Sequence, residues 1–456
     1  MENTIDYIMR KQTRTLWLLA LTALPLLPAR AQEAWTLERC MQYAVEHNHD
    51  VRLQQFSLDD ARAERLRARG SFLPSLDASG SAQFNFGRAI DPETNTYTNV
   101  STFYNGYGVQ ASIPVFDGLQ RWNGLQTAKL NVALGRESVR ACRDEVAQQV
   151  MRQYVDALYC RGALDLARGK RAESAELLRR ARVMVEVGTR SAADTAQMRA
   201  TYAADDYEVT RQENLLLTAV RTLKQLMNYP IDEELVLEGT LPFEPQTATP
   251  AAHDVAETAL ASHPSVRMAE LNVQTALRDL RSARGAFFPS ISLGAGVSTT
   301  YYRQTGGNGG VDFRTQLRNN MGEYVYAGVS VPLFSRLGLI CNLKRRKNHV
   351  ERARENLDAE RTELRRLVQE ATADHRAALQ EMDKMRRKVE ADSLAAHLVV
   401  RQFEEGIASP VDVQTATVSL LQSRASLLQS RLGYVYVKRM LDYYQGIPLY
   451  IYGQDD

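Results

Sequence analysis

The sequence contains one set of motifs twice, and this duplication limits the folds available to the chain. Arg69–Leu76 reads RGSFLPSL, and Arg284–Ile291 reads RGAFFPSI. Two more motif pairs keep nearly the same spacing of about 215 residues: IPVF with VPLF, and VGT with EGI. A period of this length indicates a duplicated half-molecule and not a solenoid repeat. We therefore expect each half to fold into the same structural unit.

The N-terminal segment has the pattern of a secretory signal peptide. A basic stretch at residues 10–14 precedes an apolar run at residues 16–27, and Ala29-Arg30-Ala31 provides a small-x-small cleavage site. We assign residues 1–31 to this signal, and the sequence leaves open whether translation begins at Met1 or Met9. No later run reaches the length of a membrane-spanning helix, about 18 apolar residues.

Composition excludes several classes of function. The net charge of +2 gives no reason to expect a nucleic-acid partner. The four cysteines and the histidines show no metal-ligand spacing, so no metal or cofactor is expected. Asp374-His375 has no evident nucleophile beside it, and we do not expect an enzyme.

Four segments alternate apolar with small polar residues, as strands do. They lie at about 75–87, 104–116, 290–302 and 323–334. Each is about as long as a tilted strand that crosses a bilayer, and aromatic residues gather at both strand ends. A soluble sandwich is the alternative, but two aromatic girdles favour a membrane β-barrel wall. Four strands cannot close a barrel, so we expect the chain to oligomerise.

The rest of each half has the pattern of long helices. Residues 119–187 and 338–405 carry apolar or small residues every seven positions, which predicts coiled-coil-like packing over about 100 Å. Shorter helices are expected beside them, at 36–70, 192–228, 253–286 and 410–444. The first repeat then spans 32–228 and the second 251–445. A proline-rich linker at 229–250 joins them, and 446–456 form a C-terminal tail.

Both long helices are expected to end in the same kind of turn. Gly188 and Gly406 suit the left-handed position that follows a helix. Serine three residues before Asp194, and again before Asp412, forms a capping-box pattern that starts the returning helix. We call these two turns the tips, and expect them at the end of the rod opposite the strands.

The order and spacing of these motifs resemble the TolC-like outer-membrane factor family over essentially the whole mature chain. The resemblance is carried by the F-x-P-S strand entries, the strand-exit motifs, the G-x-x-S-x-x-D tips and Trp35-Thr36-Leu37-Glu38. It implies a mainly α-helical fold with a transmembrane β-barrel part. In this fold a homotrimer builds a twelve-stranded barrel in the outer membrane, with four strands from each chain. A periplasmic α-helical barrel continues it.

The resemblance also implies partners and site residues. A periplasmic adaptor coupled to an inner-membrane transporter would dock at the tips, where Val187, Gly188 and Thr189 match the family's V-G-x signature. The second tip departs from that signature, and Gly406 and Ile407 are its adaptor-contact candidates. Some members have two acidic gate positions near the second tip. The candidates for the periplasmic gate are Asp194, Asp412 (which matches one acidic position) and Thr415 (which replaces the other).

Two assignments stay open. Asp194 and Asp412 are explained by helix capping as well as by a gate, and both roles can coexist. Lys344-Arg345-Arg346-Lys347 follows the last strand, where it forms either a solvated helix face or a contact with outer-membrane lipid head groups.

We expect an outer-membrane channel that conducts substrates passively from the adaptor and pump to the exterior. A type I protein-secretion channel is the alternative within transport. A non-conducting envelope tether and a soluble coiled-coil scaffold are alternatives of other classes. The sequence does not identify the substrate.

Overall fold

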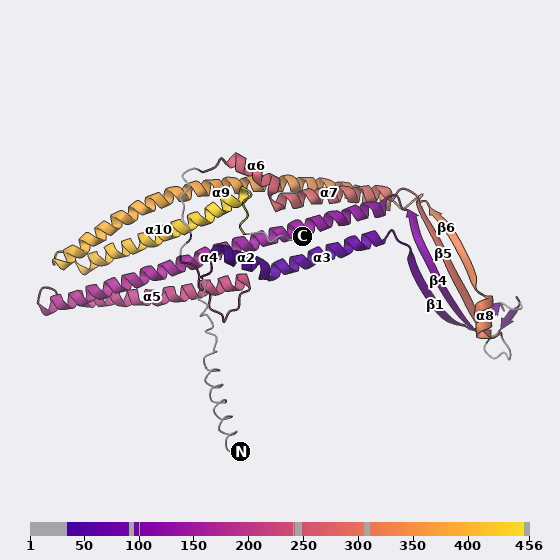
Figure 1. Ribbon diagram of the computed structural model, residues 1–456, viewed down its shortest axis with the longest axis horizontal. Coiled ribbons are helices and arrows are strands. Elements are labelled where there is room, and N and C mark those ends of the chain that lie inside the picture. The colour runs from indigo at the N-terminus through magenta and orange to yellow at the C-terminus, as the bar shows by residue number, and fades with distance from the viewer. Residues whose placement is uncertain are drawn as a thin grey trace, which may run out of the picture.

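The computed structural model describes residues 34–90, 95–99, 101–239, 241, 249–304 and 311–450. The expected signal peptide at 1–31 lies outside this range, as do parts of the linker and tail. The described chain is a long rod of helices with a sheet at one end and two helical tips at the other (Figure 1). None of its helices is long and apolar enough to span a membrane.

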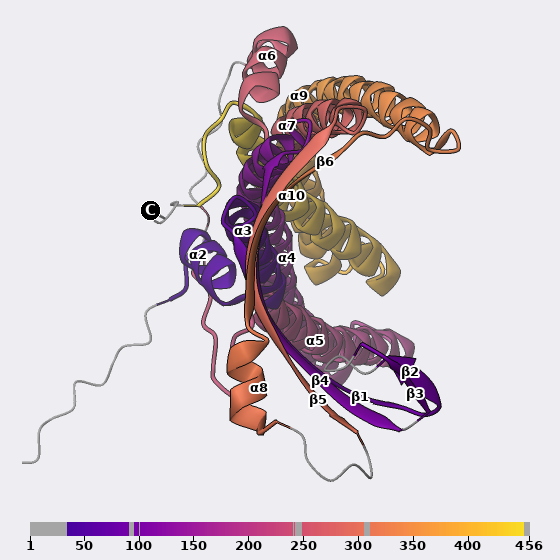
Figure 2. The same cartoon turned by 90° about the vertical axis from the view of Figure 1, so that its right-hand side faces the viewer.

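Four antiparallel strands make the main sheet, in the order β1-β4-β5-β6. They are β1 (Ser75–Asn85), β4 (Thr102–Phe116), β5 (Ser290–Gln304) and β6 (Gly322–Ser330). Each repeat contributes one hairpin, and the β4–β5 pairing joins the two hairpins. Seen down the long axis, the sheet is an open arc, with α2 and α6 on its convex side (Figure 2).

The strand register gathers the apolar residues of all four strands on one face. Leu76 pairs with Ala111, which pairs with Ala295, which pairs with Val325. Because strand side chains alternate between faces, the other face carries the serines, Gln110 and the strand glycines other than Gly80. Two charged residues, Arg303 and Glu323, stand on the apolar face toward the end away from the helices. The apolar face includes Leu76, Ala78, Phe84, Val109, Ala111, Ile113, Leu293, Ala295, Val297, Val325, Ala327 and Val329.

The expected strand at 323–334 is too long. β6 ends at Ser330, before Pro332. A proline has no amide hydrogen to continue the ladder. β4 does include Pro114, but its pairing with β5 shifts register there.

Three short elements were not expected from the sequence. They are β2 (Arg88–Ile90) and β3 (Tyr97–Asn99), which pair with each other, and α8 (Phe313–Asn319). The buried Gln316 side chain joins α8 to β5. Its Nε2 donates to the Tyr302 carbonyl, and its Oε1 accepts from the Tyr302 amide. Gln316 thereby supplies to β5 the hydrogen bonds that a neighbouring strand would give.

Two long helices form the rod. α4 (Gln120–Glu186) and α9 (Gly338–Glu404) have 67 residues each. α5 (Ala192–Met227) returns along α4, and α10 (Pro410–Tyr444) returns along α9. Val132, Val139 and Val146 of the seven-residue stripe are buried, as coiled-coil-like packing requires.

The expected single helices at 36–70 and 253–286 are each broken in two. Asn48 separates α2 (Leu37–His47) from α3 (His49–Gly70), and its side chain accepts the Asp50 amide. His263 separates α6 (Ala252–Ser262) from α7 (Pro264–Gly285). A residue before proline is disfavoured in the helical region, so Pro264 stops α6 and begins α7. Both breaks lie near mid-length of the rod (Figure 1).

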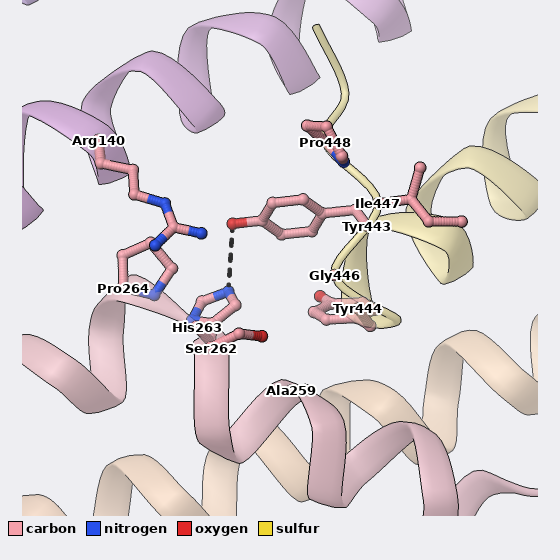
Figure 3. Close-up of a pocket in the computed structure, with 10 residues that line it drawn as sticks. All are labelled: Arg140, Ala259, Ser262, His263, Pro264, Tyr443, Tyr444, Gly446, Ile447 and Pro448. Carbon is pink, nitrogen blue, oxygen red and sulfur yellow. Dashed lines mark hydrogen bonds between the residues drawn. The ribbon is translucent and has the colours of Figure 1, made fainter. Parts of the chain in front are cut away.

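A small network at the His263 break joins three helices (Figure 3). His263 Nδ1 accepts the Ser265 amide at 3.3 Å, so the neutral ring carries its proton on Nε2. Nε2 lies 3.4 Å from the Tyr443 hydroxyl, which donates to Asp144 Oδ2 at 3.0 Å. Burial, helped by the charge of Arg140, lowers the pKa of His263 to about 4. The network therefore joins α7, α10 and α4 through a neutral histidine.

The junction between rod and sheet depends on two glycines. Gly118 has φ +67°, and a Cβ there would stand 2.0 Å from the Gly285 carbonyl oxygen. A Cβ on Gly285 would stand 2.2 Å from the Gly118 oxygen. The two backbones approach so closely that neither position accepts a side chain. This contact sets the end of α7 against the turn between β4 and α4.

Candidate functional site: the helical tips

The first tip is a tight turn between α4 and α5. Gly188 has φ +77°, its amide donates to the Val185 carbonyl, and the Thr189 amide donates to Met184. The Thr189 hydroxyl bonds the same Met184 carbonyl at 2.9 Å. These bonds are a Schellman-type closure, which uses the last carbonyls of a helix.

The second tip repeats this geometry between α9 and α10. Gly406 has φ +83°, and the Ile407 amide donates to the Gln402 carbonyl at 2.8 Å. Pro410 occupies the first position of α10, where a missing amide hydrogen costs nothing. Both tips therefore follow from local sequence, because each glycine stands at a left-handed position.

Asp194 and Asp412 are both members of complete capping boxes. Ser191 Oγ accepts the Asp194 amide while Asp194 accepts the Ser191 amide, each at 3.2 Å. Ser409 and Asp412 form the same reciprocal pair, and the Ser409 hydroxyl also bonds the Asp412 carboxylate at 2.7 Å. Hydrogen bonds from Ser409 hold the pKa of the Asp412 carboxyl below its ordinary value. The capping role is thus present at both tips.

The remaining candidate residues are open to solvent in the single chain. Val187 is 69% exposed and Ile407 is 73% exposed, although both are large apolar residues. Thr415 is exposed one turn into α10, and its hydroxyl donates to the Val411 carbonyl. Its hydroxyl therefore already has an intrahelical partner. The two exposed apolar side chains at the tips are available to a partner.

Arg190 links the first tip to the second. Its Nη2 donates to the Ala408 carbonyl at 2.7 Å and to the Phe403 carbonyl at 3.1 Å. The guanidinium carbon lies 4.6 Å from the centre of the Phe403 ring, within the range of a cation–π contact. The Arg190 side chain is 11% exposed, and Asp194 lies 3.9 Å away. We refer to Arg190 and its two carbonyl acceptors as the tip clamp.

Apolar packing and two polar contacts support the tip clamp. Phe403, fully buried, packs with residues of both hairpins. Arg180 forms an ion pair with Glu404, and Gln197 donates to Gln414 at 3.2 Å. The rest of this cluster is Leu177, Leu178, Ala181, Met198, Ala408 and Val413. The two tips of one chain are therefore held together by contacts that would separate if the hairpins moved apart.

At the other end of the rod, tyrosines cover glycines on the polar face of the sheet. A Cβ on Gly294 would meet the Tyr326 ring at 2.4 Å, and one on Gly296 would meet the Tyr324 ring at 2.6 Å. The Tyr324 hydroxyl lies 3.4 Å from Gln110 Oε1. The glycines therefore leave room for two tyrosine rings to lie flat across the neighbouring strand.

Comparison with known proteins identifies the family. The family model described as outer membrane efflux protein matches residues 40–229 and 255–436, which is most of the chain. The chain belongs to the outer membrane efflux protein family.

Individual relatives are similar in sequence over most of the chain. The outer membrane efflux protein BepC of Brucella suis is 24% identical over 369 residues, covering 80% of this chain and 75% of BepC. The probable efflux pump outer membrane protein TtgC of Pseudomonas putida is 23% identical over 426 residues, covering 89% and 83%. These relatives are named as efflux components and not as enzymes.

Solved structures show the same fold. The outer membrane protein VceC of Vibrio cholerae superposes with a TM-score of 0.74 at 15% identity, covering 91% of this chain and 95% of VceC. The open state of the MtrE channel of Neisseria gonorrhoeae gives 0.70 at 19% identity, covering 90% and 88%. The expected TolC-like fold, a helical barrel with a β-barrel part, is confirmed. This family member is an outer-membrane protein with a periplasmic portion.

Sequence reasoning missed Arg190 and the network at His263. An arginine two residues after the tip glycine carries no motif, because its acceptors are carbonyls about 215 residues away. The His263-Pro264 pair did offer a signal, since a residue before proline tends to leave the helix.

Proposed function

We propose that three copies of this chain form a passive channel through the outer membrane and across the periplasm. The observation that carries this proposal is the sheet order, in which β1 and β6 are the two edge strands. An edge strand exposed to lipid leaves backbone groups unpaired, at a cost of several kcal/mol each. Pairing β6 with β1 of the next copy removes this cost and closes a wall.

In this arrangement the apolar face of each sheet contacts lipid, and the polar face with Tyr324 and Tyr326 lines the lumen. The long helices α4 and α9 continue the wall as a tube. The chain contributes the duct, and a partner pump supplies the energy.

We also propose that the tips are both the adaptor contact and the gate. Val187, Gly188 and Thr189 of the first tip, with Gly406 and Ile407 of the second, offer exposed backbone and apolar side chains to the adaptor. Opening would move the α9–α10 hairpin away from α4–α5 and release the tip clamp. Asp194, Asp412 and Thr415 lie in the first turns of α5 and α10, next to the tips that would move apart. Asp194 and Asp412 can therefore act in the gate while they cap their helices.

Planar-bilayer recording tests the channel proposal. Purified full-length protein should insert as a trimer and show discrete conductance that increases when the tip clamp is removed. A trimer that inserts but never conducts, even without the clamp, would support the tether. Recovery of the protein without detergent would support the soluble scaffold.

Crosslinking in the cell envelope tests the docking end. A cysteine at Thr189 or Ile407 should capture a periplasmic adaptor, and one at mid-rod should not. Capture from mid-rod positions alone would place docking elsewhere. The identity of the captured partner separates an efflux pump from type I protein secretion.

A further inference from the structure

Exposed basic side chains without ion pairs gather where the helices meet the sheet. Arg69 ends α3, Arg281 and Arg284 end α7, and Lys344, Arg345 and Lys347 lie near the start of α9. All six are exposed, and none forms an ion pair within the described residues. We call these six residues the basic collar. Unpaired basic residues also occur singly along the rod, but the collar adjoins the sheet.

Three other basic residues at this level do have acidic partners. Arg67 pairs with Glu64 at 2.5 Å, Arg121 with Asp117 at 2.9 Å, and Arg346 with Asp279 at 3.0 Å. The carboxylates of Glu64, Asp117 and Asp279 are therefore already used. The collar is left with positive charge that the chain does not neutralise.

A belt of exposed apolar residues separates the collar from the strands. Phe288 is 59% exposed, Phe334 is 80% exposed, and Leu333 is 92% exposed. Large apolar side chains followed by basic ones are the usual order from the hydrocarbon region to the head groups of a membrane. In Figure 1 the ends of α3 and α7 and the start of α9 all reach the base of the sheet.

The distances along α9 fit a phosphate layer. Lys344 and Lys347 lie six and nine residues after Gly338, which at 1.5 Å per residue is about 9 and 14 Å into the rod. The polar region of one leaflet extends about 5–8 Å beyond the hydrocarbon. A lysine or arginine stem can extend toward it and place its charge among the phosphates.

The duplication shows that the rod does not need these charges. The matching stretch of the first repeat, Gln126–Lys129 at the start of α4, has one basic residue where α9 has four. Both helices nevertheless run for 67 residues. The extra charge of the second repeat therefore serves something other than helix formation.

We propose that the basic collar binds the phosphate groups of anionic phospholipids in the periplasmic leaflet of the outer membrane. This proposal rests on the proposed function, in which the sheet lies in the outer membrane. It adds the class of lipid that the chain binds there. The collar is unequal between the repeats, so the α7–α9 side of each chain binds more strongly than the α3–α4 side. The bound lipids hold the sheet at a fixed depth in the membrane.

Lipid retention by the full-length trimer tests this directly. Protein is exchanged into detergent micelles with equal amounts of phosphatidylglycerol and phosphatidylcholine, purified, and its bound lipid is measured by mass spectrometry. The wild type should retain more phosphatidylglycerol than phosphatidylcholine. In the variant K344Q/R345Q/K347Q the ratio of the two retained lipids should fall at least tenfold, because each charge near an anionic surface contributes about fivefold to binding.

A matched control removes three charges from the same helix. Arg365, Arg376 and Lys384 are exposed, have no ion pair in the described chain, and begin about 30 Å farther along α9. R365Q/R376Q/K384Q should retain phosphatidylglycerol as the wild type does. Equal loss in both variants, or no loss in the collar variant, overturns the proposal.

Ionic strength gives a second measurement on the unaltered protein. Retention should fall steeply between about 0.05 and 0.5 M salt, because exposed charges are screened. Salt-independent retention overturns the proposal even if the collar variant fails to assemble. Conductance is recorded separately, so a trimer that conducts without lipid preference refutes the collar alone.

Discussion

Removing the tip clamp should favour the open channel. Arg190→Ala deletes two hydrogen bonds from a charged donor and the contact with the Phe403 ring. Hydrogen bonds to charged groups contribute about 1.5–3 kcal/mol each, and an exposed cation–π contact about 0.5–1 kcal/mol. Water can reach the two freed carbonyls at the tip, so the net loss is smaller than this sum. We expect about 2–3 kcal/mol.

A loss of this size changes the ratio of open to closed tips by about 30- to 150-fold, since each 1.4 kcal/mol is a factor of ten. The assay is single-channel recording of the trimer in a planar bilayer, scored as open probability. Arg190→Lys should give an intermediate value, because one ammonium cannot reproduce the planar, forked geometry of a guanidinium.

Arg179→Ala is the matched control. Arg179 lies near the end of α4, before the tip, but within the described residues its ion pair is with Glu176 one turn away, and its side chain is 67% exposed. Its removal should leave open probability within about twofold of the wild type, because exposed ion pairs contribute little. An unchanged open probability in Arg190→Ala, with the trimer intact, would refute the assignment of the clamp to the closed state.

Three further predictions concern caps and junctions. Asp412→Ala should speed hydrogen exchange in the first turn of α10, because it removes one half of the capping box, whereas Asp412→Asn keeps an acceptor there and changes ion selectivity only if the carboxylate faces the pore. Because folding lowers the pKa of His263, the unfolded chain binds more protons than the folded chain between pH 6.5 and about 4. The stability from the neutral ring is complete above that window and falls by up to about 3 kcal/mol as pH drops through it. His263→Asn should remove this pH dependence in denaturation midpoints while keeping a cap, and an unchanged dependence would contradict the assignment. Gly118→Ala should lower the melting temperature of the trimer because its Cβ meets the Gly285 backbone, while Gly124→Ala, with nothing within 4 Å, should not.

Local patterns were enough to predict most elements of this fold. Alternation located the four long strands, and the seven-residue stripe located α4 and α9, because both periodicities follow from backbone geometry alone. The tips were predictable for the same reason, since Gly188 and Ser191 act within a few residues of themselves. The breaks at Asn48 and His263 were missed because a helical pattern on both sides hides one non-helical residue.

The duplication itself determined the architecture: two hairpins and two rods, with two tips at one end. It could not determine how the strands of the two hairpins align with each other, because that depends on the β4–β5 pairing between repeats. Nor could it determine the tip clamp, since Arg190 finds its acceptors only after the two hairpins pack together. Local geometry is encoded in neighbouring residues, whereas contacts across about 215 positions exist only once the tertiary structure has closed that distance.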